Sequence, residues 1–223
     1  MQTAPPGHGG ASACKLARLL GGLPDNSARF FLKVGSQHVH CPSMIHGQGK
    51  LHCVGARMPE SRRIETLEDL GILYTGSTAF DRICFLATEG LGFPISTVSF
   101  LYQDEQWFKA AVGLQVRSAP RAHSFCQEVI KADGVLVVPD AAKDFRFRPN
   151  PLVDGPPYIR TYAGAPIIYA PGLRLGAVCI IDTAPREITA RHTAFLETLA
   201  LICVDQLRLV KASRLARHSR AAA

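Results

Sequence analysis

The chain has 223 residues, enough for one domain with extensions or at most two small domains, and its apolar content of 47% suits an ordinary globular core. Its net charge of +7 is concentrated at the two ends. Residues 1–60 hold six Lys or Arg against two acids, and five basic residues without any acid follow Asp205. A nucleic-acid-binding domain needs a basic face on its folded part. The near-neutral middle of the chain therefore argues against nucleic acid as a partner.

Membrane and secreted classes are also disfavoured. No apolar run approaches the roughly 20 residues that a membrane-spanning helix needs. The first residues lack the basic start, apolar block and small-residue cleavage site of a signal peptide. The seven cysteines are an odd number. Cys84, Cys179 and Cys203 lie in apolar runs, where a free cysteine acts as a small hydrophobe, so we interpret Cys84 and Cys179 as structural. We expect a reduced, cytoplasmic protein with no membrane segment.

Residues 1–60 show no sustained helical or strand period, and we expect an irregular, disordered extension. This segment contains the closest His and Cys pairs of the chain, which are His38, His40 and Cys41, and then His52 and Cys53. Structural zinc sites use wider spacings such as C-x2-C followed by H-x3-5-H. Adjacent side chains on an extended chain also point to opposite faces. We therefore expect no metal.

Two amphipathic helices are predicted next. The first covers about 62–74. The second begins at Thr78, with Asp81 as its capping-box partner, and ends at Gly90-Leu-Gly92. Its apolar residues recur at the spacing of one helix face, and they are Phe80, Ile83, Cys84, Ala87 and Leu91.

Strands dominate the middle of the chain. Segment 95–102 is rich in β-formers, and 107–112 returns after a polar turn, so the two predict an antiparallel hairpin. In the first strand Thr97 and Ser99 alternate with larger apolar residues. Ser124 is a candidate cap for a short helix through Ile130, and a brief strand is expected at 135–138.

A second hairpin is predicted from 163–169 and 173–181, joined by a tight turn. In its second strand Leu175, Ala177, Cys179 and Ile181 lie on one face, and Val178 and Ile180 on the other. A strand that is apolar on both faces is buried on both faces. We therefore expect it to be central. Consecutive strands joined by tight turns indicate an α+β sandwich with an antiparallel sheet and flanking helices.

The last helix is predicted from about Thr189 to Leu215, with residues 210–223 forming a basic tail. It carries two apolar stripes. One is Phe195, Leu199, Ile202 and Leu209, and the other is Leu196, Ala200, Cys203, Leu207 and Val210. The second keeps the 4-3-4-3 spacing of a coiled-coil seam, so we expect a 196–210 seam between two chains. The alternative is that both stripes belong to the core.

The stretch 137–182 contains the most informative part of the sequence. A long segment without a regular helical or strand pattern separates its first short strand from the final hairpin. Loops of this length in compact domains are usually lids or binding loops. Its aromatic and charged residues, together with Phe125 earlier in the chain, suggest a pocket with aromatic walls and a few polar anchors. The expected walls are Phe125, Phe147, Tyr158 and Tyr162, and the anchors are Asp140, Arg146 and Arg160. Alternatively, the arginines pair with Asp140, Asp144 or Asp154 and hold the loop shut.

Residues 63–209 resemble a GAF domain of the type found in bacterial sensor proteins. The residues that carry the resemblance occur in the expected order, and they are L-G-I-L-Y-T (70–75), F-D-R-I (80–83), F-P-I-S-T-V-S (93–99), Q-W-F-K (106–109), H-S-F-C (123–126), V-V-P-D-A (137–141), D-F-R-F-R-P-N-P-L-V (144–153), I-R-T-Y-A-G-A-P (159–166) and R-L-G-A-V-C-I-I-D (174–182). The resemblance implies a central sheet of five or six antiparallel strands, with the terminal helices on one face and a small-molecule pocket under loops on the other.

The resemblance further implies a sensory or regulatory module of signal transduction that binds a small ligand and is often dimeric through its terminal helices. We expect a homodimer through the C-terminal helix, and signalling through dimerisation or a separate output protein, because an output domain would need far more chain than follows Leu209. Its cofactor stays unknown, because neither Cys126 nor Cys179 is followed by the His of a bilin attachment site. We expect no enzymatic activity. The alternative is a thiol-based redox sensor, or an enzyme resembling free methionine sulfoxide reductase, centred on Cys126, which lies in the first turn of a predicted helix.

Overall fold

A computed structural model describes residues 58–221, which fall within the compact unit Leu51–Ala223. The His and Cys pairs of the N-terminal segment lie outside the described residues. Helix α1 spans Glu60–Leu70, so it begins within the last residues of the segment predicted to be irregular. It ends four residues earlier than predicted, because Gly71 adopts a left-handed conformation at φ 57° and closes the helix.

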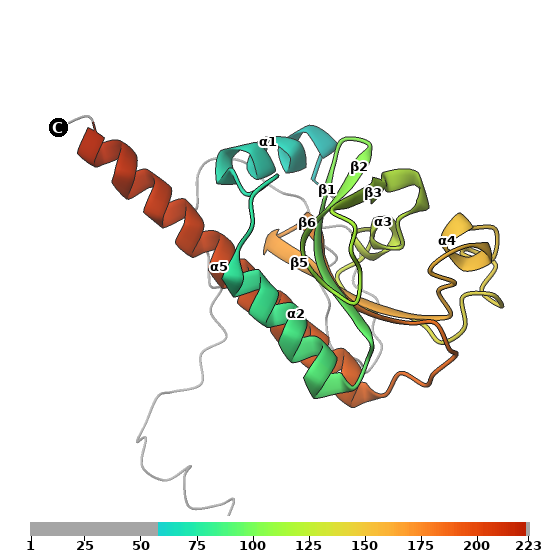
Figure 1. Ribbon diagram of the computed structural model, residues 1–223. Helices are drawn as coiled ribbons and strands as arrows, with labels where there is room; N and C mark the ends of the chain where they lie inside the picture. Colours follow the sequence, from blue (N-terminus) through green and yellow to red (C-terminus); the bar gives the residue numbers. More distant parts are fainter. Residues whose placement is uncertain (1–57, 222–223) are drawn as a thin grey trace, which may run out of the picture. The chain divides into compact units, whose positions relative to one another are not determined.

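A six-stranded antiparallel sheet forms the centre of the domain (Figure 1). Its order is β3-β2-β1-β6-β5-β4, and the strands are β1 (Ile95–Tyr102), β2 (Glu105–Val112), β3 (Ser118–Pro120), β4 (Leu136–Val138), β5 (Thr161–Ala170) and β6 (Leu173–Asp182). The two predicted hairpins are confirmed. Strand β6 pairs with β1 on one side and β5 on the other, which confirms its central place. The three-residue β3 was not predicted.

The helices divide between the two faces of the sheet. Helices α1, α2 (Thr78–Leu91) and α5 (Ala190–Ala221) pack on one face over the larger hydrophobic core. The short helices α3 (Cys126–Val129) and α4 (Pro151–Asp154) lie on the side of the second core (Figure 1). This arrangement confirms the α+β sandwich. None of the helices between residues 58 and 221 is both long and apolar enough to cross a membrane.

Two predicted helix caps differ from those observed. Helix α2 starts at Thr78, but its N-cap position is Ser77, and no side chain there accepts a capping hydrogen bond. Helix α3 starts at Cys126 after Phe125, and no side chain among the described residues accepts a capping hydrogen bond there. Both helices therefore begin without the side-chain cap that the sequence suggested.

A β-bulge changes which face Leu175 occupies. The sequence placed Leu175 with Ala177, Cys179 and Ile181, yet it packs in the helix-side core. Strand β5 pairs Ile167 with Gly176 and Ile168 with Arg174, so Leu175 is an extra residue without a partner. One inserted residue shifts the alternation by one position. The prediction was therefore right for the strand and wrong for this side chain.

The predicted seam on the last helix is also corrected. Leu196, Cys203 and Leu207 have no exposed surface within a single chain, and they belong to the helix-side core. The seam is core because α5 covers β5 and also contacts α2, which requires a broader apolar face than a coiled-coil seam. The apolar residues left exposed on α5 are Leu201, Ile202, Leu209 and Leu215. The helix also continues to Ala221, through most of the expected basic tail.

Candidate functional site

The segment between β4 and β5, residues 139–160, forms a lid together with α3. Beneath it lies the second core, in which the rings of Phe125 and Phe147 stack with centroids 4.1 Å apart and an interplanar angle of 3°. Tyr162 lies against Phe125 with ring centroids 5.0 Å apart. Three of the four predicted pocket walls therefore pack on one another. In this conformation the protein fills the predicted pocket with its own side chains.

The outer lid residues are held mainly by neighbouring residues. Arg146 donates two hydrogen bonds to the Asp144 carboxylate, at 2.9 and 2.6 Å, and its guanidinium lies 5.1 Å from the Phe147 ring centroid. The hydrogen bonds from Arg146 hold the pKa of Asp144 below its usual value. This pair is one of the ion pairs expected in the closed-loop alternative.

The remaining predicted anchors do not point together into a pocket. Asp140 pairs with Lys143 at 3.1 Å and accepts a hydrogen bond from the Ala142 amide. Arg160 donates to the backbone carbonyls of Val153 and Ile159 rather than to an acid. Tyr158 is half exposed, with its backbone at φ 59°. The structure thus brings together Phe125, Cys126, Phe147 and Tyr162, while Asp140, Arg146, Tyr158 and Arg160 lie on the lid itself.

A polar cluster surrounds the Cys126 sulfur inside this otherwise apolar core. Ser99 Oγ donates to Cys126 Sγ at 3.4 Å, and Gln106 Nε2 donates at 3.2 Å. The Tyr162 hydroxyl hydrogen-bonds with the same sulfur at 3.3 Å. Cys179 belongs to the same core and lies on β6, which contacts the helix that begins at Cys126. We call the set Ser99, Gln106, Cys126, Tyr162 and Cys179 the sulfur cluster.

The strand register explains how distant residues meet in this cluster. Strands β1 and β6 pair Thr97 with Cys179, and the Thr97 hydroxyl lies 2.9 Å from the Cys179 sulfur. On its other side Cys179 faces Gly164 of β5. A Cβ at Gly164 would lie 2.5 Å from the Tyr162 hydroxyl oxygen. Glycine at this position therefore leaves the space that Tyr162 uses to reach the sulfurs.

The four cysteines of the described residues form two chemically different pairs. The neighbouring Cys179, aided by Ser99 and Tyr162, lowers the pKa of Cys126 to about 7 in spite of its burial. The neighbouring Cys126, together with burial, raises the pKa of Cys179. On the helix side, burial raises the pKa of Cys84 to about 12 and also raises the pKa of Cys203. Among these four cysteines, only Cys126 combines burial with a lowered thiol pKa.

The sequence identified Cys126 but missed most of its partners. Cys179 was interpreted as structural because it lies in an apolar strand. The signal that could have found the cluster is the placement of Thr97 and Ser99, two hydroxyl residues on one face of β1, where both are fully buried. Gln106 carried no such signal, because it stands in the segment read as a polar turn.

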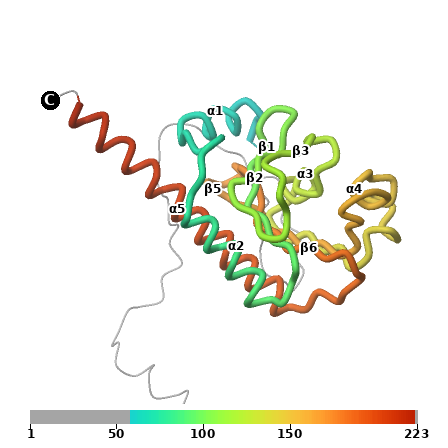
Figure 2. Tube along the Cα trace, in the orientation of Figure 1, coloured from blue at the N-terminus to red at the C-terminus, as the bar shows by residue number. Residues whose placement is uncertain are grey.

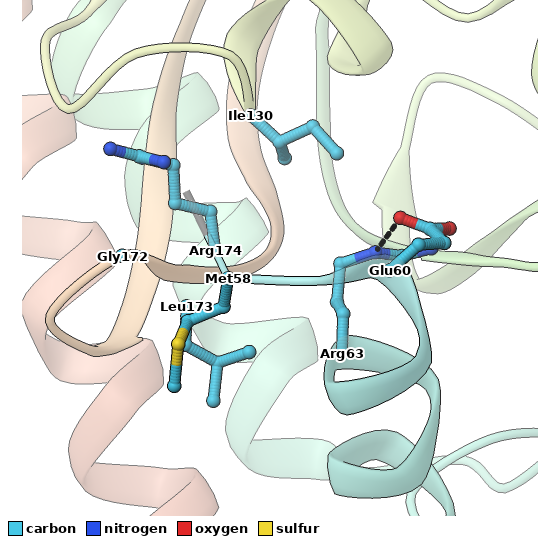
Figure 3. A pocket seen from close by; sticks show the side chains of 7 residues that line it. All are labelled: Met58, Glu60, Arg63, Ile130, Gly172, Leu173 and Arg174. Carbon is cyan, nitrogen blue, oxygen red and sulfur yellow. Dashed lines mark hydrogen bonds and ion pairs between the residues drawn. The ribbon is translucent and has the colours of Figure 1, made fainter. Parts of the chain in front are cut away.

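Three depressions on the surface are alternative sites. Figure 3 shows one of about 10 Å³ between the start of α1 and the start of β6, which has room for a single water. There Glu60 pairs with the buried Arg63, while Arg174 points away from them and pairs with Asp133. Depressions of about 180 and 460 Å³ lie beside α5 and beside the β1–β2 turn. Among residues 58–221, no group of three or more His, Cys, Asp or Glu side chains is arranged to hold a metal ion.

Comparisons with known proteins agree with this architecture. The cyclic di-GMP phosphodiesterase PA2567 of Pseudomonas aeruginosa is 40% identical over 156 residues, which are 69% of this chain and 27% of that protein. The chain thus spans about a quarter of this relative's length.

Solved structures share the fold at low sequence identity. The chromophore-binding domain of a bacteriophytochrome from R. palustris has a TM-score of 0.52 at 12% identity, covering 69% of this chain and 62% of that one. The free methionine-R-sulfoxide reductase of Neisseria meningitidis has a TM-score of 0.50 at 13% identity, covering 74% and 99%. The GAF domain family model matches residues 73–206, more than half of the chain. This protein therefore belongs to the GAF domain family.

Proposed function

We propose that this protein is a regulatory GAF module of signal transduction that acts by forming a homodimer through α5 and the neighbouring α2. The observation that carries the proposal is the row of apolar side chains that these two helices leave exposed. On α5 the exposed fractions are 37% for Ile202 and 59% for Leu209. On α2 the exposed fraction is 49% for Leu86, which lies one turn before Gly90, the residue that faces Phe195 of α5.

The two helices form one continuous surface. They contact each other directly, and Figure 2 shows them side by side. Apolar side chains that gather on adjoining helices mark interaction sites more often than isolated ones do. A second copy of the chain is the partner that presents the same apolar surface, which a two-fold interface requires. The proposed interface therefore differs from the 196–210 seam, which is already buried.

The output is proposed to lie outside residues 58–221. The relative from Pseudomonas aeruginosa is a cyclic di-GMP phosphodiesterase, and the similar region is only part of it. We infer that this module regulates an activity carried by other residues or by a partner protein. Its ligand would be a small molecule that enters the second core, beneath the lid, by separating the Phe147 ring from the Phe125 ring. Native mass spectrometry of the protein purified from its own host tests this part, and a protein free of any bound molecule counts against it.

Analytical ultracentrifugation tests the dimer. We expect the wild-type protein to sediment as a dimer at micromolar concentration, and a variant with Ile202→Glu and Leu209→Glu to sediment as a folded monomer. Leu201→Glu is the matched control, because position 201 lies about 100° around the helix from 202. A monomeric wild type would refute the proposal, and so would dissociation of the Leu201→Glu control to the same extent.

A further inference from the structure

We propose that Cys126 and Cys179 form a redox-active pair that a hydroperoxide oxidises to a disulfide. The inference rests on the sulfur cluster and does not depend on the dimer interface. It extends the redox alternative from a single cysteine to a pair, because the second cysteine is one that the sequence had assigned to structure. It also gives a role to polar side chains that a purely structural core would not need.

The geometry around Cys126 favours its thiolate. Gln106 Nε2 and Ser99 Oγ both donate to the sulfur, and the Tyr162 hydroxyl is within hydrogen-bonding distance of it. Gln106 also donates to Ser99 Oγ at 2.9 Å, which orients the serine hydroxyl. Donors that converge on one sulfur stabilise its anionic form, which is the nucleophilic form of cysteine. The lowered pKa of Cys126, about 7, agrees with this geometry.

Cys179 is placed to complete the reaction. It lies in the same core as Cys126, on the strand that contacts α3, and its raised pKa keeps it protonated while Cys126 is ionised. In the first step the Cys126 thiolate attacks one peroxide oxygen, the O–O bond breaks, and the released alkoxide or hydroxide takes up a proton. The product is a sulfenic acid on Cys126. In the second step the Cys179 sulfur displaces the sulfenic hydroxyl, which leaves as water with the Cys179 proton.

The overall reaction balances as a two-electron oxidation. Two thiols and one hydroperoxide give one disulfide, one alcohol and one water, or two waters when the oxidant is hydrogen peroxide. The protein supplies both electrons, and the peroxide is the only co-reactant. No metal or organic cofactor takes part.

Access limits the oxidant to a small molecule. Cys126 and Cys179 are 2% and 1% exposed, and the Phe125–Phe147 stack belongs to the core that encloses them. The lid carries Phe147, and its surface side chains pair locally, as Arg146 does with Asp144 and Lys143 with Asp140, while Asn150 donates to the His123 carbonyl. Segments held by local and partly exposed contacts open at lower free energy than the whole domain. Hydrogen peroxide is therefore the probe of choice.

The helix-side cysteines supply an internal control within the same molecule. Cys84 and Cys203 are as deeply buried as the lid-side pair, and both belong to the larger core. Their raised pKa values keep them as thiols at neutral pH. Oxidation through global unfolding would reach all four cysteines at similar rates. Oxidation through the lid would reach Cys126 and Cys179 alone among these four.

The experiment is peptide mapping by mass spectrometry without reduction, after the full-length protein is treated with hydrogen peroxide. We expect a Cys126–Cys179 disulfide that a dithiol reductant reverses, while Cys84 and Cys203 stay unmodified. In Cys179→Ser we expect a sulfenic acid on Cys126, which dimedone traps. A disulfide to another cysteine of the chain, or parallel oxidation of all four buried cysteines, overturns the proposal.

Tyr162→Phe separates a redox role from simple packing. It removes only the hydroxyl, so the ring still fills the core, but Cys126 loses one hydrogen bond. We expect the pH midpoint of the oxidation rate to rise above that of the wild-type protein, because the Tyr162 hydrogen bond helps to lower the pKa of Cys126. Far-ultraviolet circular dichroism serves as the check on folding. An unchanged pH profile in a folded Tyr162→Phe protein contradicts the proposal.

Discussion

Replacing Leu207 by alanine removes a side chain that is fully buried, whereas the same change at Leu209, two positions along the same helix, removes one that is 59% exposed. The two substitutions are chemically identical, so the difference between their effects on the unfolding free energy reports which face of α5 packs on the sheet. Leu→Ala at buried sites costs about 2.7–5 kcal/mol, through lost transfer energy and the cavity left behind. Exposed substitutions away from special contacts usually stay within about 0.5 kcal/mol. We expect Leu207→Ala to cost at least about 2 kcal/mol more than Leu209→Ala.

Urea unfolding followed by circular dichroism measures this difference. Association stabilises the folded state by mass action, so both variants should be compared at the lowest workable protein concentration. The dependence of the unfolding free energy on urea should be the same for both, because it scales with the surface exposed on unfolding. Equal destabilisation by the two changes would show that α5 turns a different face to the sheet. It would also remove the basis for placing the dimer interface at Ile202 and Leu209.

Three further outcomes follow from buried charges. Asp133→Ala leaves the Arg174 guanidinium, only 3% exposed, without its carboxylate, and we expect chemical denaturation to show a loss of about 3–5 kcal/mol. Lys109→Met removes an ammonium that donates to two backbone carbonyls and a threonine hydroxyl, and thermal unfolding should show a loss of about 1–3 kcal/mol. The Arg63 hydrogen bonds lower the pKa of Glu60 to about 2 from 4.5, so their contribution is present above pH 4.5 and is lost as the pH falls towards 2. The difference in unfolding free energy between wild type and Glu60→Gln should therefore shrink as the pH falls from 4.5 towards 2. A difference that stays constant over this range would contradict the stabilising role of the ionised Glu60.

The fold was largely predictable because its strands carry strong local signals. Strand β1 was placed at its observed bounds, and β6 was recognised as central because both of its faces are apolar. What the sequence could not give were features set by pairing between strands. The bulge at Leu175 exists only through the register of β5 on β6, and β3 is too short to show a period of its own. The prediction of a seam between two chains at 196–210 was wrong for a similar reason, because the spacing of its apolar residues fits both a coiled coil and a helix packed on a sheet.

The sequence predicted the aromatic residues of the candidate site but not the arrangement of its two sulfurs. Aromatic content identified Phe125, Phe147 and Tyr162 as lid-side residues, and the structure groups them. The sequence could not show that their rings would stack and close the pocket. Cys179 was missed because apolar neighbours indicate burial but do not reveal what lies across the sheet. Its partner Cys126 comes from a helix on a separate segment, so only the folded chain brings the two sulfurs together.

Only the backbone of the sheet lies between the sulfur cluster and the core that contains α5. Tyr162 belongs to the lid-side core, and the next residue, Ala163, belongs to the helix-side core that includes α5. Cys179 and Val178 repeat the arrangement on β6. The contacts of α5 with the sheet fall mainly on β5, whose small residues let the helix approach closely. A disulfide or a ligand under the lid therefore acts on the same two strands that seat the proposed dimer helix. Strands β5 and β6 are the shortest physical route by which the lid can influence the interface, and coupling along it requires that they have two distinct arrangements, which both sites favour differently.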